Sequence, residues 1–461
     1  MYKISELAQE KISDYLSGND MVINCTIDSC PESGEVKPHV RVYFEVSAEI
    51  GSFIRMETWL PIHWNGIFAG IGNGGLAGIM QIPELISMNS RDFAVITTDM
   101  GTSKCVEIGI EEGIENPAVH RDFGYRATHL MTEMGKVIVK LAYGQAPEYS
   151  VFAGGSTGGE QALSEAQRYP YDYDAILCGA PANDRIRLHT YFLWNFVHLR
   201  DAEKKPLFDK ETVHNIAKEA IDFLGDFTAI PKADSETVSV FVNRVAEKLS
   251  LSKEQEAALL AVYSGPVNPR TKERIFYGIP IGSEMNNSAI ANISPVSTLP
   301  NLFYPFYWGL GEQFDPFSFD FDKDFERVQE VLASEMDATS DDLSPFFQHG
   351  GKLLMIAGGA DPIIPYLETL KYCHKVAKRL DKTILDHQFK FYIAPFANHC
   401  IADFVPEFVT ADDGRDLLDI LVDWLIHERT PGILRINSHV YGVAEMQTCQ
   451  IQPVCLGGSV G

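Results

Sequence analysis

The chain has 461 residues with 38 basic and 63 acidic side chains, which gives a formal net charge of −25. Its apolar content of 45% is ordinary for a globular protein and excludes a disordered, collagen-like or coiled-coil chain. The acidic balance repels phosphate backbones and anionic lipids, so we expect no nucleic-acid partner and no membrane partner. No run of 18 apolar residues is present, and the length suits one domain with an insertion.

The N-terminal segment alternates charged and apolar residues at helical spacing and lacks the apolar core of a secretory signal. We therefore expect a cytoplasmic protein, although a secreted protein whose signal has been removed would read the same. The eight cysteines form no CxxC pair and no zinc spacing. Bridges between Cys25 and Cys30, or between Cys449 and Cys455, stay open because their short loops permit them.

Short apolar runs alternate with helical patterns along residues 1–190. Strands are predicted at Val40–Val46, Phe53–Leu60, Ile67–Ile71, Phe93–Thr98, Tyr149–Ala153 and Ala175–Cys178. Apolar residues at spacings of three and four predict helices over Tyr125–Tyr143 and over the stretch that ends at Arg168. Strands that alternate with helices favour an α/β fold with a mostly parallel, doubly wound sheet.

The pattern changes between residues 191 and 345 and resumes afterwards. Helices are predicted at Lys210–Leu224 and Ser252–Tyr263, among aromatic, proline-rich loops. The aromatic and proline content of Phe303–Phe325 excludes a regular strand. We interpret residues 191–345 as a lid (cap) inserted between core segments 1–190 and 346–461. The second core segment is predicted to hold strands at Leu353–Ala357 and Gln388–Ile393 and an amphipathic helix at Arg415–Glu428.

Residues 154–158 read Gly-Gly-Ser-Thr-Gly and fit the pattern G-x-S-x-G. A strand is predicted before them and a helix after them, as a nucleophile elbow requires. The pattern also occurs at residues 457–461, which lack both elements, so we dismiss that match. Ser156 is therefore the candidate nucleophile. The alternative is a glycine-rich turn that only packs or binds a phosphate.

A serine nucleophile needs a base, and the base needs an orienting acid. In α/β-hydrolases the order along the chain is Ser, Asp, His. Asp361 follows one predicted strand and His399 follows the next, so both lie at carboxyl ends of strands, where such sheets bind ligands. We select these two residues, with Asp403 as the alternative acid. The other histidines precede the acid or lie on predicted helices.

Ester hydrolysis by a serine nucleophile also requires an oxyanion hole. The glycine-rich segment 72–75 follows an early strand, and glycines let backbone N–H groups approach a ligand. We expect Gly75 or Gly74 to supply one donor and the Thr157 N–H to supply the other. A plain glycine turn is the alternative.

At this point the chain resembles the tannase/feruloyl esterase family of α/β-hydrolases, which includes the MHET hydrolases. The matching segments lie at 59–66, 72–78, 122–129, 154–159, 165–170, 179–182, 263–266, 278–284, 350–353, 360–362 and 399–400. The resemblance implies an α/β-hydrolase fold with a lid over the site. It also implies hydrolysis of esters of aromatic acids such as gallate, ferulate or caffeate.

Three departures from the family pattern stand out. The family's cysteine before the nucleophile is Gly155 here, so Cys400 lacks its expected disulfide partner, and Val40 replaces an early family cysteine. The loss of these bridges fits a reducing compartment. The lid's usual calcium loop keeps only Asp222 and Asp226, too few for a cation that takes about six to eight oxygens, so we predict no structural calcium.

The third departure concerns residues near the site: Glu160, Ala357 and Thr102 replace the usual Arg, His and His. These changes bear on the identity of the substrate. The reaction expected is ester hydrolysis through an acyl-enzyme by Ser156, Asp361 and His399, without a metal or other cofactor. The lid is expected to supply an aromatic substrate pocket from Phe303, Tyr304, Phe306, Tyr307 and Trp308, although packing explains these rings equally well. Two alternatives stay open: acyl transfer or lactone chemistry on the same triad, and a non-catalytic binding protein.

Overall fold

The computed structural model describes residues 4–226, 228–230, 234–285, 299–399, 409–411, 413–438 and 447–456. The chain forms two compact units, and neither is a single continuous segment. Unit 1 comprises Met1–Asn183, Ser334–Leu354 and Leu421–Arg429, and unit 2 comprises Asp184–Ala333, Met355–Ile420 and Thr430–Gly461. No helix in the described ranges is both long enough and apolar enough to cross a membrane.

Unit 1 is built around a sheet. Its elements in chain order are α1 (Glu6–Ser17), β1 (Val22–Cys30), β2 (His39–Val46), β3 (Ile54–Pro61), β4 (Ile67–Ile71), α2 (Ile82–Ser90), β5 (Ala94–Thr98), α3 (Ser103–Glu107), η1 (Ile110–Gly113), α4 (Pro117–Arg121), η2 (Asp122–Arg126), α5 (Ala127–Tyr143), β6 (Tyr149–Gly155), α6 (Thr157–Arg168), β7 (Ala175–Gly179) and α13 (Ser344–Gln348). Their strands run in the order β1-β2-β3-β5-β4-β6-β7. The pairs from β1 to β5 are antiparallel, and β5, β4, β6 and β7 are parallel.

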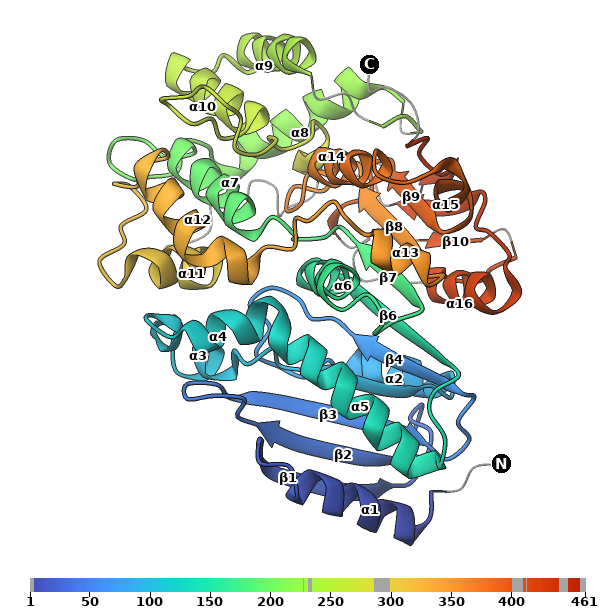
Figure 1. Cartoon of the computed structure of the whole chain (residues 1–461). Coiled ribbons are helices and arrows are strands. Elements are labelled where there is room, and N and C mark those ends of the chain that lie inside the picture. Colours follow the sequence, from blue (N-terminus) through green and yellow to red (C-terminus); the bar gives the residue numbers. More distant parts are fainter. Residues whose placement is uncertain are drawn as a thin grey trace. The chain divides into compact units, whose positions relative to one another are not determined.

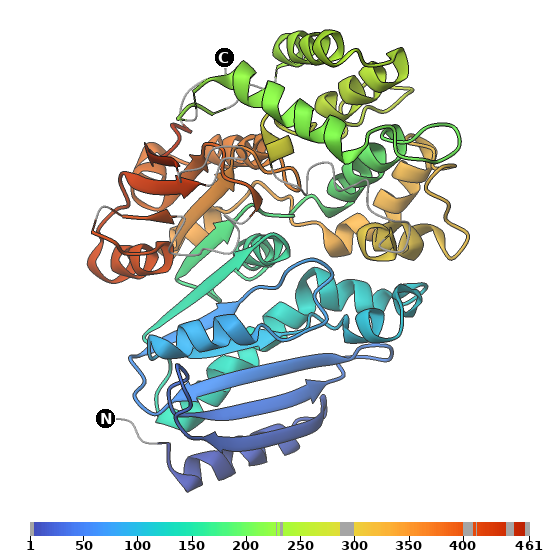
Figure 2. The same cartoon turned by 180° about the vertical axis from the view of Figure 1, so that it is seen from behind.

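Helices cover both faces of this sheet: Figures 1 and 2 show α1 and α5 on one face and α2 on the other. The five residues of β4 and the five of β5 are all buried, as expected for parallel strands that are covered on both sides. Gly135 lets α5 approach the sheet closely, because a Cβ atom there would lie 2.9 Å from the ring of Phe68. The core of unit 1 therefore lies between the sheet and these helices.

Unit 2 contains mainly helices. Its elements are α7 (Arg185–His198), α8 (Lys210–Leu224), α9 (Ser235–Leu249), α10 (Lys253–Ser264), η3 (Ser283–Met285), α11 (Leu299–Leu310), α12 (Lys323–Met336), α14 (Tyr366–Ala377), α15 (Lys382–His387), β9 (Phe389–Ala394), β10 (Val409–Thr410), β11 (Leu434–Ser438) and β12 (Gln447–Ile451). Two elements are divided between the units, β8 (Lys352–Gly358) and α16 (Leu417–His427). β8 begins next to β7, where Lys352 N donates to Asp174 O at 2.9 Å. Strands β10, β11 and β12 form a small antiparallel sheet.

The strands predicted from apolar runs are confirmed, since β2 to β9 end within two residues of the predicted limits. The predicted helices correspond to α5, α6, α8, α10 and α16. The aromatic stretch is not a strand: it begins within α11, which contains Pro305. Elements that the sequence patterns did not indicate include β1, β11, β12, α7, α9 and α12. The described cysteines, which do not include Cys400, carry free thiols, so the two pairings left open are not formed.

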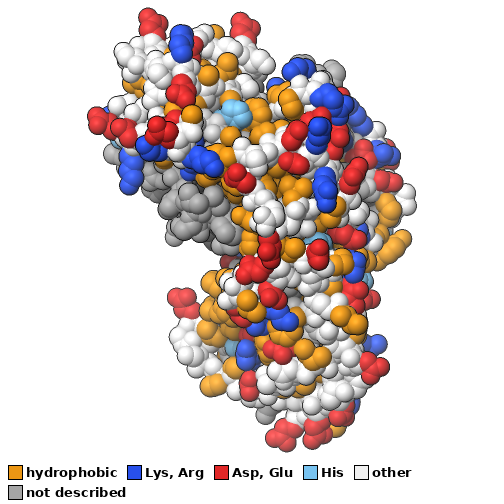
Figure 3. Space-filling model, turned by 90° about the vertical axis from the view of Figure 1, so that its left-hand side faces the viewer, with side chains coloured by type: hydrophobic (Ala, Val, Ile, Leu, Met, Phe, Trp, Pro, Cys, Tyr) orange, Lys and Arg blue, Asp and Glu red, His pale blue; other side chains and the backbone are white. Residues whose placement is uncertain are grey.

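The acidic composition is visible at the surface. In Figure 3, acidic side chains gather at the end of the face that carries α1 and β1. The exposed residues of α1 include Glu6, Glu10 and Asp14. Elsewhere on that face acidic and basic side chains alternate.

The close packing of η2 provides a test of the fold. A Cβ atom at Gly124 would overlap the carbonyl oxygen of Glu335, which is backbone and does not yield easily. We expect Gly124→Ala to destabilise unit 1 by about 1–3 kcal/mol and to lower the thermal midpoint. The control is Gly432→Ala, because no atom lies within 4 Å of a Cβ built there. Equal midpoints for the two variants in thermal unfolding would contradict this packing.

Candidate active site

Ser156 lies at the sharp turn between β6 and α6. Its backbone has φ 59° and ψ −119°, a strained conformation for a residue with a side chain. Two hydrogen bonds hold it there: Ser156 N donates to Gly179 O and Ala182 N donates to Ser156 O, both at 2.9 Å. The turn needs glycine on either side, because a Cβ atom at Gly154 would overlap Gly158 O. The predicted elbow is therefore present as a local structure.

The glycine segment follows β4, the strand beside β6. The two strands are parallel and pair Ile71 with Ala153, so the loops that follow them leave the sheet at the same edge. Thr157 Oγ1 donates to Gly75 O at 2.7 Å. Gly75 has φ +56°, a conformation that favours glycine. Unit 1 therefore brings together Ser156, Thr157 and the Gly74–Gly75 loop.

Asp361 and His399 form a hydrogen-bonded pair in unit 2. Asp361 Oδ2 lies 2.8 Å from His399 Nδ1. The carboxyl group is fully buried, and its other oxygen accepts from Ile363 N at 2.8 Å and from Ile364 N at 3.0 Å. An acid held by two backbone N–H groups has a fixed direction, so it fixes the imidazole that it contacts. The alternative acid, Asp403, lies outside the described residues.

The loops that carry this pair are tied to each other and to α7. Ala360 N donates to Ala397 O at 3.0 Å, and a Cβ atom at Gly358 would overlap the same oxygen. On the other side, the buried Tyr191 hydroxyl donates to Pro362 O at 2.7 Å. Sequence reasoning missed Tyr191, because nothing in the sequence connects it to a loop 171 residues away.

The five aromatic residues predicted to line a pocket lie on α11. Phe303, Tyr304, Phe306 and Trp308 are buried, and Tyr307 is half-buried. They pack against other rings of unit 2: Phe303 lies 5.5 Å from Phe196 and Phe306 lies 5.2 Å from Phe314, measured between ring centroids. These contacts identify an aromatic cluster within unit 2, and the role of the rings toward a substrate stays a prediction.

Asp99 follows β5 at the same sheet edge as Ser156. Burial raises the pKa of its carboxyl to about 6, although backbone hydrogen bonds oppose the shift. Its Oδ1 accepts from Arg55 N at 2.9 Å and from Gly101 N at 2.8 Å. A carboxylate that accepts two backbone N–H groups fixes the conformation of the loop around it, so we assign Asp99 a structural role.

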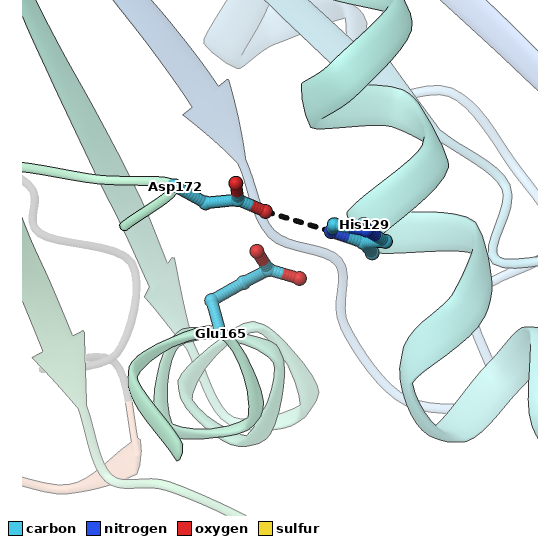
Figure 4. A group of neighbouring side chains, drawn as sticks. All are labelled: His129, Glu165 and Asp172. Carbon is cyan, nitrogen blue, oxygen red and sulfur yellow. Dashed lines mark hydrogen bonds and ion pairs between the residues drawn. The ribbon is translucent and has the colours of Figure 1, made fainter. Parts of the chain in front are cut away.

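His129, Glu165 and Asp172 form a group of possible metal ligands (Figure 4), and their ligand atoms lie within 4.8 Å of one another. His129 Nδ1 lies 2.7 Å from Asp172 Oδ2, and the ring stacks on Tyr169. Glu165 is buried and its carboxyl points toward the other two side chains. A histidine with two carboxylates suits a divalent transition metal.

The surroundings favour a proton over a metal ion in this group. Burial, and then the charge of Asp172, raise the pKa of Glu165 well above its ordinary value. The Lys136 ammonium donates to the backbone carbonyl of Asp172. Burial disfavours the charged form of Glu165, and Lys136 lies beside Asp172, so the group needs no ion to offset its charge and we assign it a structural role. At the position of the family's usual calcium loop, where no calcium is predicted, Asp226 accepts from Thr228 N at 2.8 Å.

Glu165→Gln tests this assignment. The pKa of Glu165 is higher in the folded protein than in the unfolded chain. As the pH rises between these two pKa values, the unfolded chain releases a proton that the folded protein retains, so the free energy of unfolding of wild type falls. Glu165→Gln has no carboxyl to titrate and does not show this decrease, which in wild type amounts to about 1.4 kcal/mol per pH unit at most. We expect urea denaturation in EDTA to show that the variant gains stability relative to wild type from pH 5 to pH 8.

The matched control is Glu133→Gln, because the Glu133 side chain is 59% exposed and lies 3.4 Å from His129 Nε2. Its stability should change with pH in the same direction as that of wild type, because the charge of Glu133 contributes least to the raised pKa of Glu165. Parallel profiles for wild type and Glu165→Gln, or stabilisation of wild type by Zn²⁺, would contradict the protonated carboxyl.

Comparisons with known proteins identify the family. The family model described as tannase and feruloyl esterase matches residues 40–297 and 310–456. A probable feruloyl esterase B-1 of Aspergillus terreus is 25% identical, over 93% of this chain and 85% of its own length. Feruloyl esterase B of Aspergillus niger is 26% identical, over 86% of this chain and 79% of its own length.

Solved structures share the fold. Feruloyl esterase B from Aspergillus oryzae matches with a TM-score of 0.79 at 21% identity, covering 97% of this chain and 95% of that chain. Tannin acyl hydrolase from Aspergillus niger matches with a TM-score of 0.69 at 18% identity, covering 94% and 87%. The predicted α/β-hydrolase fold is confirmed. The chain belongs to the tannase and feruloyl esterase family, and it is a carboxylic ester hydrolase.

Proposed function

We propose that the protein cleaves esters of aromatic, phenolic acids with Ser156 as nucleophile, His399 as base and Asp361 as orienting acid. The observation that carries the proposal is the strained Ser156 turn at the start of α6, stabilised by two backbone hydrogen bonds. Strain of about 1–3 kcal/mol at a residue with a side chain persists only where surrounding contacts enforce it, and such residues cluster at active sites.

The reaction begins with proton transfer. His399 takes the hydroxyl proton of Ser156 as the serine oxygen attacks the ester carbonyl carbon. The tetrahedral intermediate collapses when His399 returns the proton to the departing alcohol, and an acyl-enzyme remains. Water, deprotonated by His399, then attacks the acyl carbon, and the acid leaves as Ser156 recovers its proton. Asp361 keeps the imidazole in the tautomer that these steps require and stabilises its charged form.

Backbone N–H groups stabilise the charge that develops on the carbonyl oxygen. We assign this role to Thr157 and Gly75, with Gly74 as the alternative in the glycine loop. The bond from Thr157 Oγ1 to Gly75 O supports the assignment, because it ties the two donor-bearing segments together. One donor of this kind contributes about 2.7–4 kcal/mol to transition-state stabilisation.

The acyl group is inferred from relatives and composition. The relatives are named feruloyl esterases and a tannin acyl hydrolase, and the acids in such esters are planar and aromatic. We propose that residues 191–345 act as the lid and that rings of α11 contribute to an aromatic pocket. Phe303, Tyr304, Phe306, Tyr307 and Trp308 stay the candidates, and their tight mutual packing gives such a wall rigidity.

Hydrolysis of a panel of esters by wild type and Ser156→Ala tests the proposal. The panel contains methyl gallate, methyl ferulate, chlorogenate, a terephthalate monoester and p-nitrophenyl acetate. We expect turnover of an aromatic ester that falls by at least about 10³-fold in the variant, because the acyl-enzyme cannot form. Turnover of p-nitrophenyl acetate alone would overturn the phenolic substrate class. A fluorophosphonate probe that labels wild type and Ser156→Ala equally would overturn the nucleophile.

Asp361→Asn tests the orienting acid separately. The variant keeps the size of the side chain but presents an amide where His399 needs a charged acceptor. We expect kcat to fall by about 10³–10⁴-fold with little change in KM. The control is Asp381→Asn, which makes the same change at a helix N-cap that accepts from Ile384 N at 2.9 Å. Steady-state kinetics with kcat unchanged in Asp361→Asn would exclude the assigned role.

A further inference from the structure

We infer that Gln161 is a positioning residue that sets the geometry of the oxyanion hole through Asn73. The inference rests on the proposed function and extends it to residues that do not touch the substrate. Gln161 lies in the second turn of α6, and Asn73 lies in the glycine segment between β4 and Gly74. Both side chains are buried, with exposed fractions of 1% and 3%.

Gln161 binds the backbone of the glycine segment directly. Asn73 N donates to Gln161 Oε1 at 2.7 Å. The amide end of Gln161 is fixed in turn, because Nε2 donates to the buried hydroxyl of Thr128 on α5 at 2.9 Å. The Gln161 side chain therefore connects the glycine segment to α5 through α6.

The rest of Asn73 is held as well. Its Nδ2 donates to Thr98 O, at the end of β5, at 2.8 Å, and its backbone oxygen accepts from Gly158 N at 2.6 Å. This last bond has a chemical consequence. The Gly158 N–H lies in the first turn of α6, where backbone N–H groups can donate to an oxyanion. It already donates to Asn73 O, so it is not available to an oxyanion. The bond links the nucleophile turn and the glycine segment through main-chain atoms.

The residues after Asn73 are held by hydrogen bonds and not by side-chain packing. A Cβ atom built at Gly74 or Gly75 would meet no atom within 4 Å. The conformation of this loop depends on its two ends and on the turn bond from Ala77 N to Gly74 O at 2.9 Å. Asn73 holds the first end, and the bond from Thr157 Oγ1 to Gly75 O holds the second. If Asn73 shifts, no side-chain packing at Gly74 or Gly75 keeps the loop in place, so the Gly75 N–H can move as well.

The substitution Gln161→Met removes the side-chain oxygen that anchors Asn73. Methionine has a similar length and stays compatible with burial, but it leaves the Asn73 N–H without its acceptor. An oxyanion donor acts only over a narrow range of positions, and a displacement of about 1 Å costs about 100-fold in rate. We therefore expect kcat to fall by about 100-fold while KM changes less than about twofold.

A second readout separates positioning from general damage. A trifluoromethyl ketone analogue of the best ester in the panel adds to Ser156 and forms a tetrahedral oxyanion, whereas the free product acid forms none. We expect Gln161→Met to weaken inhibition by the ketone by the same factor as kcat/KM. Its affinity for the product acid should stay unchanged.

Thr132→Val is the matched control. Thr132 is buried one turn after Thr128 on α5, and its hydroxyl donates to Thr128 O at 2.9 Å. In the described part of the chain this hydroxyl bonds Thr128 O and the Tyr173 hydroxyl and makes no hydrogen bond to the glycine segment. Its removal should lower the thermal midpoint without changing inhibition by the ketone. If Gln161→Met does not fold, Thr128→Val replaces it. That variant removes one of the two acceptors of Gln161 Nε2 and leaves the other, Asn73 Oδ1 at 3.4 Å, so we expect a smaller loss in the same direction.

The outcomes are distinct. Wild-type kcat and wild-type ketone inhibition in folded Gln161→Met would overturn the inference, and so would equal losses in Thr132→Val. Failure of the proposed function gives a different result, because wild type would then show no Ser156-dependent turnover and no fluorophosphonate labelling. Loss of kcat and ketone affinity in Gln161→Met alone supports the positioning role.

Discussion

The end of β4 and the turn into α6 lie in direct backbone contact, and the candidate chemistry of unit 1 depends on that contact. A Cβ atom at Gly72 would lie 2.5 Å from Gly158 Cα, so there is no room for a side chain where the end of β4 meets the first turn of α6. The contact allows the bond from Gly158 N to Asn73 O and brings Gly75 O within reach of Thr157. The strain at Ser156 is sustained by the same packing, because Gly154, Gly158 and Gly159 fill positions where larger residues would clash.

Much of the fold was predictable because its strands are short and continuously apolar. β4, β5, β7 and β8 are buried along their whole length, which produces the run of apolar residues that the sequence displays. β1 was missed because most of its side chains are half-buried or exposed, as in a strand covered on one side only. α7 was missed for the opposite reason. Ten of its 14 residues are buried and none is exposed, so it lacks the solvated polar face that marks a helix in a sequence.

Some residues of the candidate site were also predictable from the sequence, and others were not. The proximity of Ser156, Thr157 and Gly75 was predictable because a local motif specifies each of them. Asp361 and His399, which were selected from chain order, lie 2.8 Å apart. The catalytic roles of all five residues stay predictions, and so does the assembly of Ser156, Asp361 and His399 into one triad. Gln161 was not singled out, since its partner Asn73 lies 88 residues away and a glutamine in a helix carries no signal of its own. Only tertiary structure distinguishes a structural amide of this kind from an ordinary surface residue.

The division of the chain between its units also constrains how the protein is made. Unit 1 is completed only by Leu421–Arg429, and unit 2 begins at Asp184, long before that segment leaves the ribosome. The sheet that carries Ser156 therefore cannot finish folding while the middle of the chain is being synthesised, and long-range closure of this kind slows folding and exposes intermediates. No single truncation isolates either unit, because their segments alternate along the chain. Removal of residues 422–461 would take part of both units, so we expect such a fragment not to reach the native state.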